Sequence, residues 1–142
     1  MSTDRRTGVG AASKAWRLLA TVAVFGVVGP PVGGLATWVT MGASTLRSPI
    51  PFVTGSYGEG FVLALAAGLL VGIAALWFGS APWPVPIVVV VVVNIAVLAT
   101  TVVASPPDLV AAMIRVGRVF LPASLIATLT CWLLTRPLLR FA

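Results

Sequence analysis

The sequence has very few of the side chains with which proteins usually do chemistry. Among its 142 residues there is no histidine, one cysteine (Cys131) and only three acidic residues. Facing histidine pairs hold haem b in membrane bundles, and imidazoles or several thiolates form most zinc, copper and non-haem iron sites. One copy of this chain supplies neither, and it lacks the paired cysteines of disulfide exchange. The sequence therefore predicts no metal, no cofactor and no enzyme activity.

Charged residues are also scarce along the whole chain. They make up 8% of the residues, whereas soluble domains have about 25%, and 59% of the residues are hydrophobic. Too few polar side chains remain to cover a water-facing globule, so lipid must be the solvent. The basic residues that give the net charge of +6 lie at the edges of apolar runs rather than in one stripe. We therefore expect them to anchor the chain in a bilayer, and we expect no nucleic-acid partner.

Three stretches without charge locate the membrane spans, because a charge at the bilayer centre costs about 2.5 to 3.5 kcal/mol. They cover residues 18–46, 60–107 and 119–135. As one helix the second stretch would be about 70 Å long, more than twice the bilayer core of about 30 Å, so it must turn back. The turn is marked by Pro82, Pro84 and Pro86. The predicted spans are 17–41, 60–79, 85–104 and 119–138.

These spans predict an all-α fold. We expect a flexible basic tail over residues 1–14 and one domain over residues 15–142, a bundle of about four transmembrane helices with a kinked first helix. The valine run at 88–93 would favour a strand in water. Barrel strands alternate in polarity, however, and these runs are apolar on every face, so helices are expected here too.

The basic residues near the span ends predict the orientation. The larger group flanks the first and last spans on one side of the membrane, and the smaller group is on the other: Arg5, Arg6, Lys14, Arg17, Arg136 and Arg140 against Arg47, Arg115 and Arg118. This excess predicts cytoplasmic N- and C-termini. The first apolar run is longer than the roughly 7 to 15 residues of a secretory signal, so we expect it to be a span. The excess of Arg over Lys, with abundant Ala, Gly, Val and Pro, favours a bacterial cytoplasmic (inner) membrane.

The first span is interrupted by Gly-Pro-Pro-Val-Gly-Gly at residues 29–34. Pro30 and Pro31 remove backbone donors, so the helix should kink or break there. Broken helices near the bilayer midplane bind ions and substrates in secondary transporters. The alternative, which we favour, is a kink whose free carbonyls are satisfied by neighbouring helices, with Gly29 and Gly33 allowing close packing.

The second span carries small residues at a spacing of four. Gly60, Ala64, Gly68 and Gly72 would form a smooth groove along one face of a helix. Another helix of the same chain or a helix of a partner protein would fill this groove equally well. The sequence leaves both occupants open.

Asn94 lies at the centre of the third span among valines. A buried amide in hydrocarbon must find a hydrogen-bond partner, so Asn94 should face another helix rather than lipid. We expect it to hold helices together rather than to bind a substrate.

A short amphipathic helix is expected to begin near Asp108 and to lie on the membrane surface before the fourth span. Arg115 and Arg118 share its polar side. We expect them to anchor the chain to lipid phosphates or to an acidic partner. One long tilted helix from Asp108 through the fourth span is the alternative geometry.

The sequence shows no nucleophile beside a base, no paired carboxylates and no phosphate-binding loop. Its one glutamate, Glu59, precedes the second span, whereas small proton-coupled transporters of four helices need a carboxylate inside the membrane. We therefore expect a small non-catalytic membrane protein, an accessory, structural or assembly subunit of a larger complex. Its partners would be the lipid bilayer and other membrane subunits, and respiratory and photosynthetic complexes are examples of hosts. The alternative is an oligomeric transporter or channel for ions or small molecules.

Overall fold

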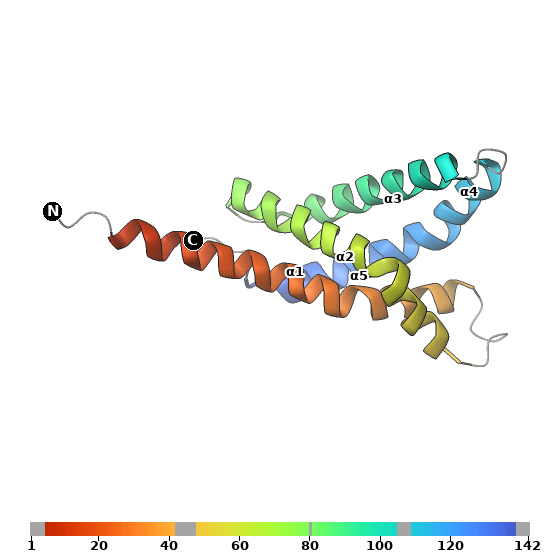
Figure 1. The fold of residues 1–142 in the computed structure, drawn as a ribbon, viewed down its shortest axis with the longest axis horizontal. Helices are drawn as coiled ribbons and strands as arrows, with labels where there is room; N and C mark the ends of the chain where they lie inside the picture. The colour runs from red at the N-terminus through yellow and green to blue at the C-terminus, as the bar shows by residue number, and fades with distance from the viewer. Residues whose placement is uncertain (1–4, 42–47, 80, 105–108, 139–142) are drawn as a thin grey trace.

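The computed structural model describes residues 5–41, 48–79, 81–104 and 109–138. Within these ranges the chain is helical and contains no strand, so the predicted all-α fold is confirmed. The elements are α1 (Arg5–Thr40), α2 (Ile50–Phe78), α3 (Pro84–Ala104), α4 (Leu109–Arg115), the π-helical segment η2 (Val116–Phe120) and α5 (Leu121–Thr135) (Figure 1). Helices are what apolar runs must form in lipid, because they satisfy every backbone polar group within the segment.

Three helical stretches in the described residues are long and apolar enough to cross a membrane. They are Ala12–Thr40, Gly60–Phe78 and Val116–Thr135. Pro84–Thr100 is a shorter apolar stretch within α3. These stretches fall in the four regions where the sequence predicted spans.

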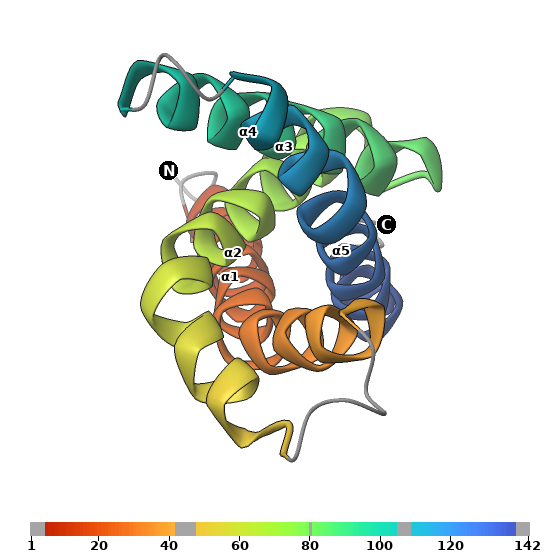
Figure 2. The ribbon, with the colours of Figure 1, turned by 90° about the vertical axis from the view of Figure 1, so that its right-hand side faces the viewer.

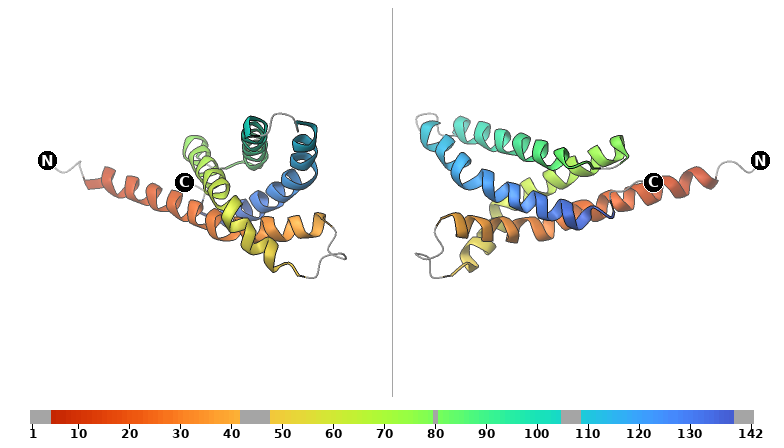
Figure 3. Two further views of the ribbon diagram at one scale, coloured as in Figure 1. Left: turned by 45° about the vertical axis from the view of Figure 1, so that its right-hand side comes forward. Right: turned by 180° about the vertical axis from the view of Figure 1, so that it is seen from behind.

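The helices surround a common centre instead of stacking in one layer. Helix α1 packs against α2 and α5, and α3 packs against α5 and α2, whereas the described residues of α1 and α3 make no contact with each other. Figure 2, viewed along the long axis, shows α1, α2, α3 and α5 around the centre, and Figure 3 shows α3 leaning away from α1. Phe25, Val71, Cys131 and Trp132 are among the buried residues of the core.

Helix α1 begins earlier than the sequence predicted. Residues 5–14 were expected to be a flexible tail, but they are helical and continue into the first span. The segment contains good helix formers, which are Ala11, Ala12, Lys14 and Ala15. Nucleation is the costly step of helix formation, and this segment avoids it because it extends a helix that the adjoining span already forms. Residues 1–4 lie outside the described residues.

The prolines of the first span do not break it. Helix α1 is continuous from Arg5 to Thr40 with Pro30 and Pro31 inside it. Figure 2 shows that the helix changes direction, because its orange C-terminal part crosses the view while its red part recedes. A bend without a break is what proline produces when neighbouring groups satisfy the freed carbonyls.

Helix α2 also extends further than predicted, since it begins at Ile50 rather than near residue 60. Pro51 lies in its first turn, where a missing N–H costs nothing, and Ser48 Oγ accepts a hydrogen bond from the backbone N–H of Ile50 at 3.3 Å. The predicted start near residue 60 followed the stretch without charge, which begins directly after Glu59. The helix ends at Gly79, whose φ of 71° is the left-handed conformation that glycine adopts most easily.

The predicted surface helix before the last span is not separate from it. Helix α4, η2 and α5 follow one another without a non-helical residue from Leu109 to Thr135. The structure therefore has the alternative geometry, one long helix, with a π-helical turn in its middle. The predicted start at Asp108 lies outside the described residues.

Candidate functional site: a glycine-lined helix interface and a central cavity

The groove predicted on α2 is filled by α1 of the same chain over most of its length. A Cβ added at Gly68 would lie 2.7 Å from Phe25 Cβ, and one added at Gly72 would collide with the side chain of Leu18. Ala64 lies against Gly29, whose added Cβ would be 3.2 Å from Ala64 Cβ.

Gly60 differs from the other three residues of the predicted groove. A Cβ placed there meets no atom within 4 Å, because Gly60 faces the central cavity. The sequence left two possible occupants for the groove, a helix of the same chain or a helix of a partner protein. The structure places the chain's own α1 against Ala64, Gly68 and Gly72, and it does not cover Gly60.

The two glycines singled out in α1 lie near α5. An added Cβ at Gly33 would be 3.8 Å from Ala127 Cβ, which is ordinary contact, and one at Gly29 would be 3.9 Å from Cys131 Sγ. Among the glycines of α1 whose surroundings the structure describes, the closest approach is instead at Gly34, where an added Cβ would be 2.6 Å from the backbone oxygen of Phe52. Helix α1 therefore touches the backbone of α2 at Gly34. Nothing in the sequence pattern distinguishes Gly34 from the other glycines of residues 29–34.

Side chains of α2 bind the backbone of α1 at its prolines. Pro31 has no N–H to offer the carbonyl of Val27, and Tyr57 Oη donates to that oxygen at 2.8 Å. Ser56 Oγ lies 2.7 Å from the carbonyl oxygens of both Pro30 in α1 and Val53 in α2, and these two acceptors share its one proton. These contacts come from the part of α2 that precedes residue 60.

Replacing Tyr57 by Phe is expected to lower the free energy of unfolding in detergent by about 0.5 to 1.5 kcal/mol, because the Val27 carbonyl loses its donor. Pro31→Ala restores an N–H to the helix at this point, so the effect of Tyr57→Phe should shrink in that background. A double-mutant cycle measured by reversible unfolding in mixed micelles checks this. An equal effect of Tyr57→Phe in both backgrounds would show that the hydroxyl does not compensate for Pro31.

Asn94 is 5% exposed and faces α5. Its Nδ2 donates to the carbonyl of Val90, one turn earlier in α3, at 2.8 Å and to Ser124 Oγ at 2.7 Å. Only the nitrogen of the amide can donate to a carbonyl, so this contact fixes which way the amide points. Its other atom, Oδ1, is buried and has no hydrogen-bond partner among the described residues.

A tryptophan of α5 fixes the turn between α2 and α3. Trp132 is 8% exposed, and its Nε1 donates to the carbonyl of Ala81 at 3.1 Å. The guanidinium of Arg136 lies 5.4 Å from the centre of the Trp132 ring, within the range of a cation–π contact. This end of the molecule, where α2, α3 and α5 meet, is therefore closed by specific contacts.

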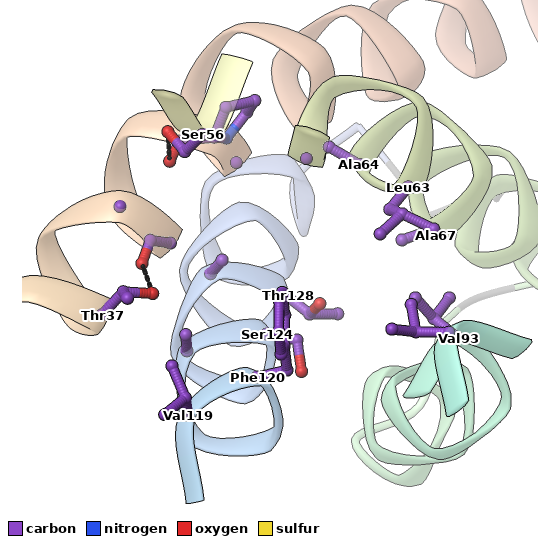
Figure 4. Close-up of a pocket in the computed structure, with 18 of the residues that line it drawn as sticks. Thr37, Ser56, Leu63, Ala64, Ala67, Val93, Val119, Phe120, Ser124 and Thr128 are labelled. Atoms are coloured by element: carbon purple, nitrogen blue, oxygen red, sulfur yellow. Dashed lines mark hydrogen bonds between the residues drawn. The ribbon is translucent and has the colours of Figure 1, made fainter. Parts of the chain in front are cut away.

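A cavity of about 340 Å³ lies between α1, α2, α3 and α5. Its wall includes the glycine–proline segment of α1, and Figure 4 shows Ser124 and Thr128 of α5 across from Val93 of α3 and Leu63 of α2. The wall is mostly apolar, with a few hydroxyls and the amide of Asn94. No charged side chain in the described part of the chain lines it.

The two arginines predicted to anchor the chain lie in the long C-terminal helix. Arg118 is in η2 and is exposed. The backbone of Arg115 ends α4, and its side chain is outside what the structure describes. Their binding to lipid or to a partner stays a prediction.

The fold and its apolar helices define a multi-pass helical membrane protein. Comparison of the chain with protein-family models, with curated proteins and with solved structures finds no match.

Proposed function

We propose that this protein is a non-catalytic accessory subunit of a larger membrane protein assembly in a bacterial cytoplasmic membrane. The observation that carries the proposal is the length of α1. Its 36 residues form a helix of about 54 Å, and the bilayer core is about 30 Å thick. Helix α1 therefore has roughly 20 Å to spare beyond the core.

The surplus lies at the N-terminal end, where α1 projects from the bundle (Figure 1). Residues 12–16 are exposed there, and Trp16 is 71% exposed. This projecting segment, residues 5–16, is basic because it contains Arg5, Arg6 and Lys14. A basic helix that is continuous with a span suits an acidic partner surface next to the membrane. The excess of basic residues favours the cytoplasm as the side on which this contact forms.

Deleting residues 2–11 is expected to remove the partner subunits that purify with the tagged chain, while the spans still fold. Lys14 and Arg17 are kept because their charges help to orient the first span. The measurement is gentle purification, native mass and identification of the proteins recovered. Val62→Ala, on an exposed face of α2, is the matched control and should keep the partners.

Labelling of a cysteine introduced as Leu138→Cys checks that the deletion leaves the chain oriented with its C-terminal end in the cytoplasm. Recovery of the full-length chain as a homo-oligomer without other subunits would contradict the proposal. That result would favour an oligomeric transporter, for which the specific supporting observation is the cavity beside the kink at Pro30 and Pro31.

A further inference from the structure

The central cavity is long and narrow, and it runs along the helices. On α1 its wall extends from Phe25 to Thr37, which is a helical rise of about 18 Å. Divided over this length, the volume of about 340 Å³ gives a mean cross-section of about 19 Å². Carbon atoms in contact lie about 3.5 to 4 Å apart, so an extended hydrocarbon chain is roughly 4 to 5 Å wide and has a comparable cross-section. The cavity therefore has the dimensions of one hydrocarbon chain.

The cavity also covers the depth of one leaflet of a bilayer. Its inner end is formed by residues near the middle of the three stretches that can cross a membrane, which are Phe25, Ala67 and Thr128. The other end includes Thr37 and Val119, which lie near the ends of these stretches. Half of a bilayer core of about 30 Å is about 15 Å. A chain that enters at the outer end therefore reaches the midplane, as the tail of a lipid does.

The wall of the cavity suits hydrocarbon. Leu63 and Ala67 of α2 face Val93 of α3 across it (Figure 4), and no charged side chain of the described residues lines it. An ion would lose its hydration there without compensation, and apolar cavities do not hold ordered water. An empty cavity would deprive the wall of dispersion contacts. Lipid tails are the apolar molecules that surround this chain in a bilayer, so they are the occupant that the wall favours.

A cation lies at the outer end of the cavity. Arg118 is exposed and directly precedes Val119 and Phe120, which belong to the cavity wall. It lies in η2, at the beginning of the apolar stretch Val116–Thr135, and therefore at the depth of the lipid headgroups. A guanidinium group binds phosphate through two parallel hydrogen bonds. A lipid whose tail fills the cavity carries its phosphate at this same end.

We propose that the central cavity binds one acyl chain of a phospholipid and that Arg118 binds the phosphate of the same lipid. This site does not depend on the accessory-subunit proposal, which rests on residues 5–16 at the other end of the bundle. The experiment needs only the isolated chain and lipids. Its failure therefore leaves the accessory-subunit proposal unaffected.

The first measurement is native mass spectrometry of the full chain, purified from its membrane and exchanged into detergent that removes loosely bound lipid. One phospholipid should remain on each chain. The chain is then loaded with phosphatidylglycerol that carries a diazirine in the middle of one acyl chain, and the retained lipid is cross-linked by light. The cross-links should fall on Leu63, Ala67 and Val93 of the wall rather than on the exposed residues Val62 and Val92.

A substitution in the cavity tests the acyl chain. Gly60→Phe should lower lipid retention at least about tenfold, because the ring takes the place of several methylene groups. An added Cβ at Gly60 meets no atom within 4 Å, so the ring can enter the cavity. Val62→Phe, on an exposed face of α2 outside the cavity wall, is the matched control and should leave retention unchanged.

A second substitution tests the phosphate. Arg118→Gln should lower retention of phosphatidylglycerol about fivefold, which is the usual effect of one basic residue at a charged membrane surface. Diacylglycerol with the same acyl chains has no phosphate, so the native chain and Arg118→Gln should retain it equally weakly.

Elution of each variant as a single species of unchanged size shows that it is folded, and the cross-link map of the native chain decides the proposal if Gly60→Phe does not fold. A native chain that retains no phospholipid, or cross-links that fall on outward-facing residues, would overturn the proposal. Unchanged retention in Gly60→Phe would also overturn it. Equal retention of diacylglycerol and phosphatidylglycerol by the native chain would contradict the contact with Arg118.

Discussion

Gly34→Ala is expected to destabilise the folded chain by about 2 to 3 kcal/mol, whereas Gly33→Ala at the neighbouring position should be neutral or slightly stabilising. A Cβ at Gly34 would lie 2.6 Å from the backbone oxygen and 2.9 Å from the carbonyl carbon of Phe52. Backbone cannot rotate away as a side chain can, so α1 and α2 would have to separate. That separation would also stretch the hydrogen bond from Ser56 to Pro30.

Gly33→Ala is a close control for this change. Both substitutions replace glycine by alanine in the same turn of α1, so both gain a similar helix propensity of roughly 1 kcal/mol. At Gly33 the nearest atom to an added Cβ is Ala127 Cβ at 3.8 Å, which is an ordinary contact. The difference between the two variants therefore isolates the cost of the collision with α2.

Reversible unfolding in mixed micelles, followed by tryptophan fluorescence, measures both free energies. A second readout is the exposure of Tyr57, which should rise in Gly34→Ala as α2 moves away from α1. Equal stabilities of the two variants would mean that α2 does not reach back to residue 52 as a helix against α1.

The sequence predicted the helical class and the four apolar regions because the bilayer leaves few choices. Residues without charge over the thickness of the membrane must be helical there, and the prolines near residue 82 force the chain to turn. The same reasoning predicted that Asn94 faces a helix, and Ser124 of α5 is the residue it contacts.

The helix ends were harder to predict, because composition alone does not distinguish a glycine-rich loop from a glycine-rich helix packed against a neighbour. The spacing of four that runs through Gly60, Ala64, Gly68 and Gly72 continues backwards to Ser56 and Phe52. These two residues meet α1 at Pro30 and Gly34. The stripe therefore extends along the whole of α2, and only the contact with α1 reveals its first two members.

The cavity could not be predicted from any local pattern. It exists because α3 contacts α5 and α2 but no described residue of α1, and helix tilt is a property of the packed bundle. Ser124 and Thr128 are ordinary residues of an apolar helix in the sequence. They become neighbours of Asn94 and of the cavity only when α3 and α5 pack together.

Gly68→Ala is expected to destabilise the chain by about 1 to 3 kcal/mol, and Gly60→Ala, two turns earlier in the same stripe, should not. An added Cβ at Gly68 would be 2.7 Å from Phe25 Cβ and 3.2 Å from the backbone of Val22. Phe25 is 1% exposed, and its Cβ cannot move without α1. At Gly60 an added Cβ meets no atom within 4 Å.

The comparison of these two variants decides between the two occupants that the sequence left open for the groove on α2. If α1 fills it, the isolated chain in detergent loses stability in Gly68→Ala alone, and the loss needs no partner. If a partner protein fills it, the isolated chain tolerates both substitutions and only the recovery of partners falls. Measuring unfolding of the purified chain beside recovery of its partners separates an interface within the fold from a contact made by the assembly.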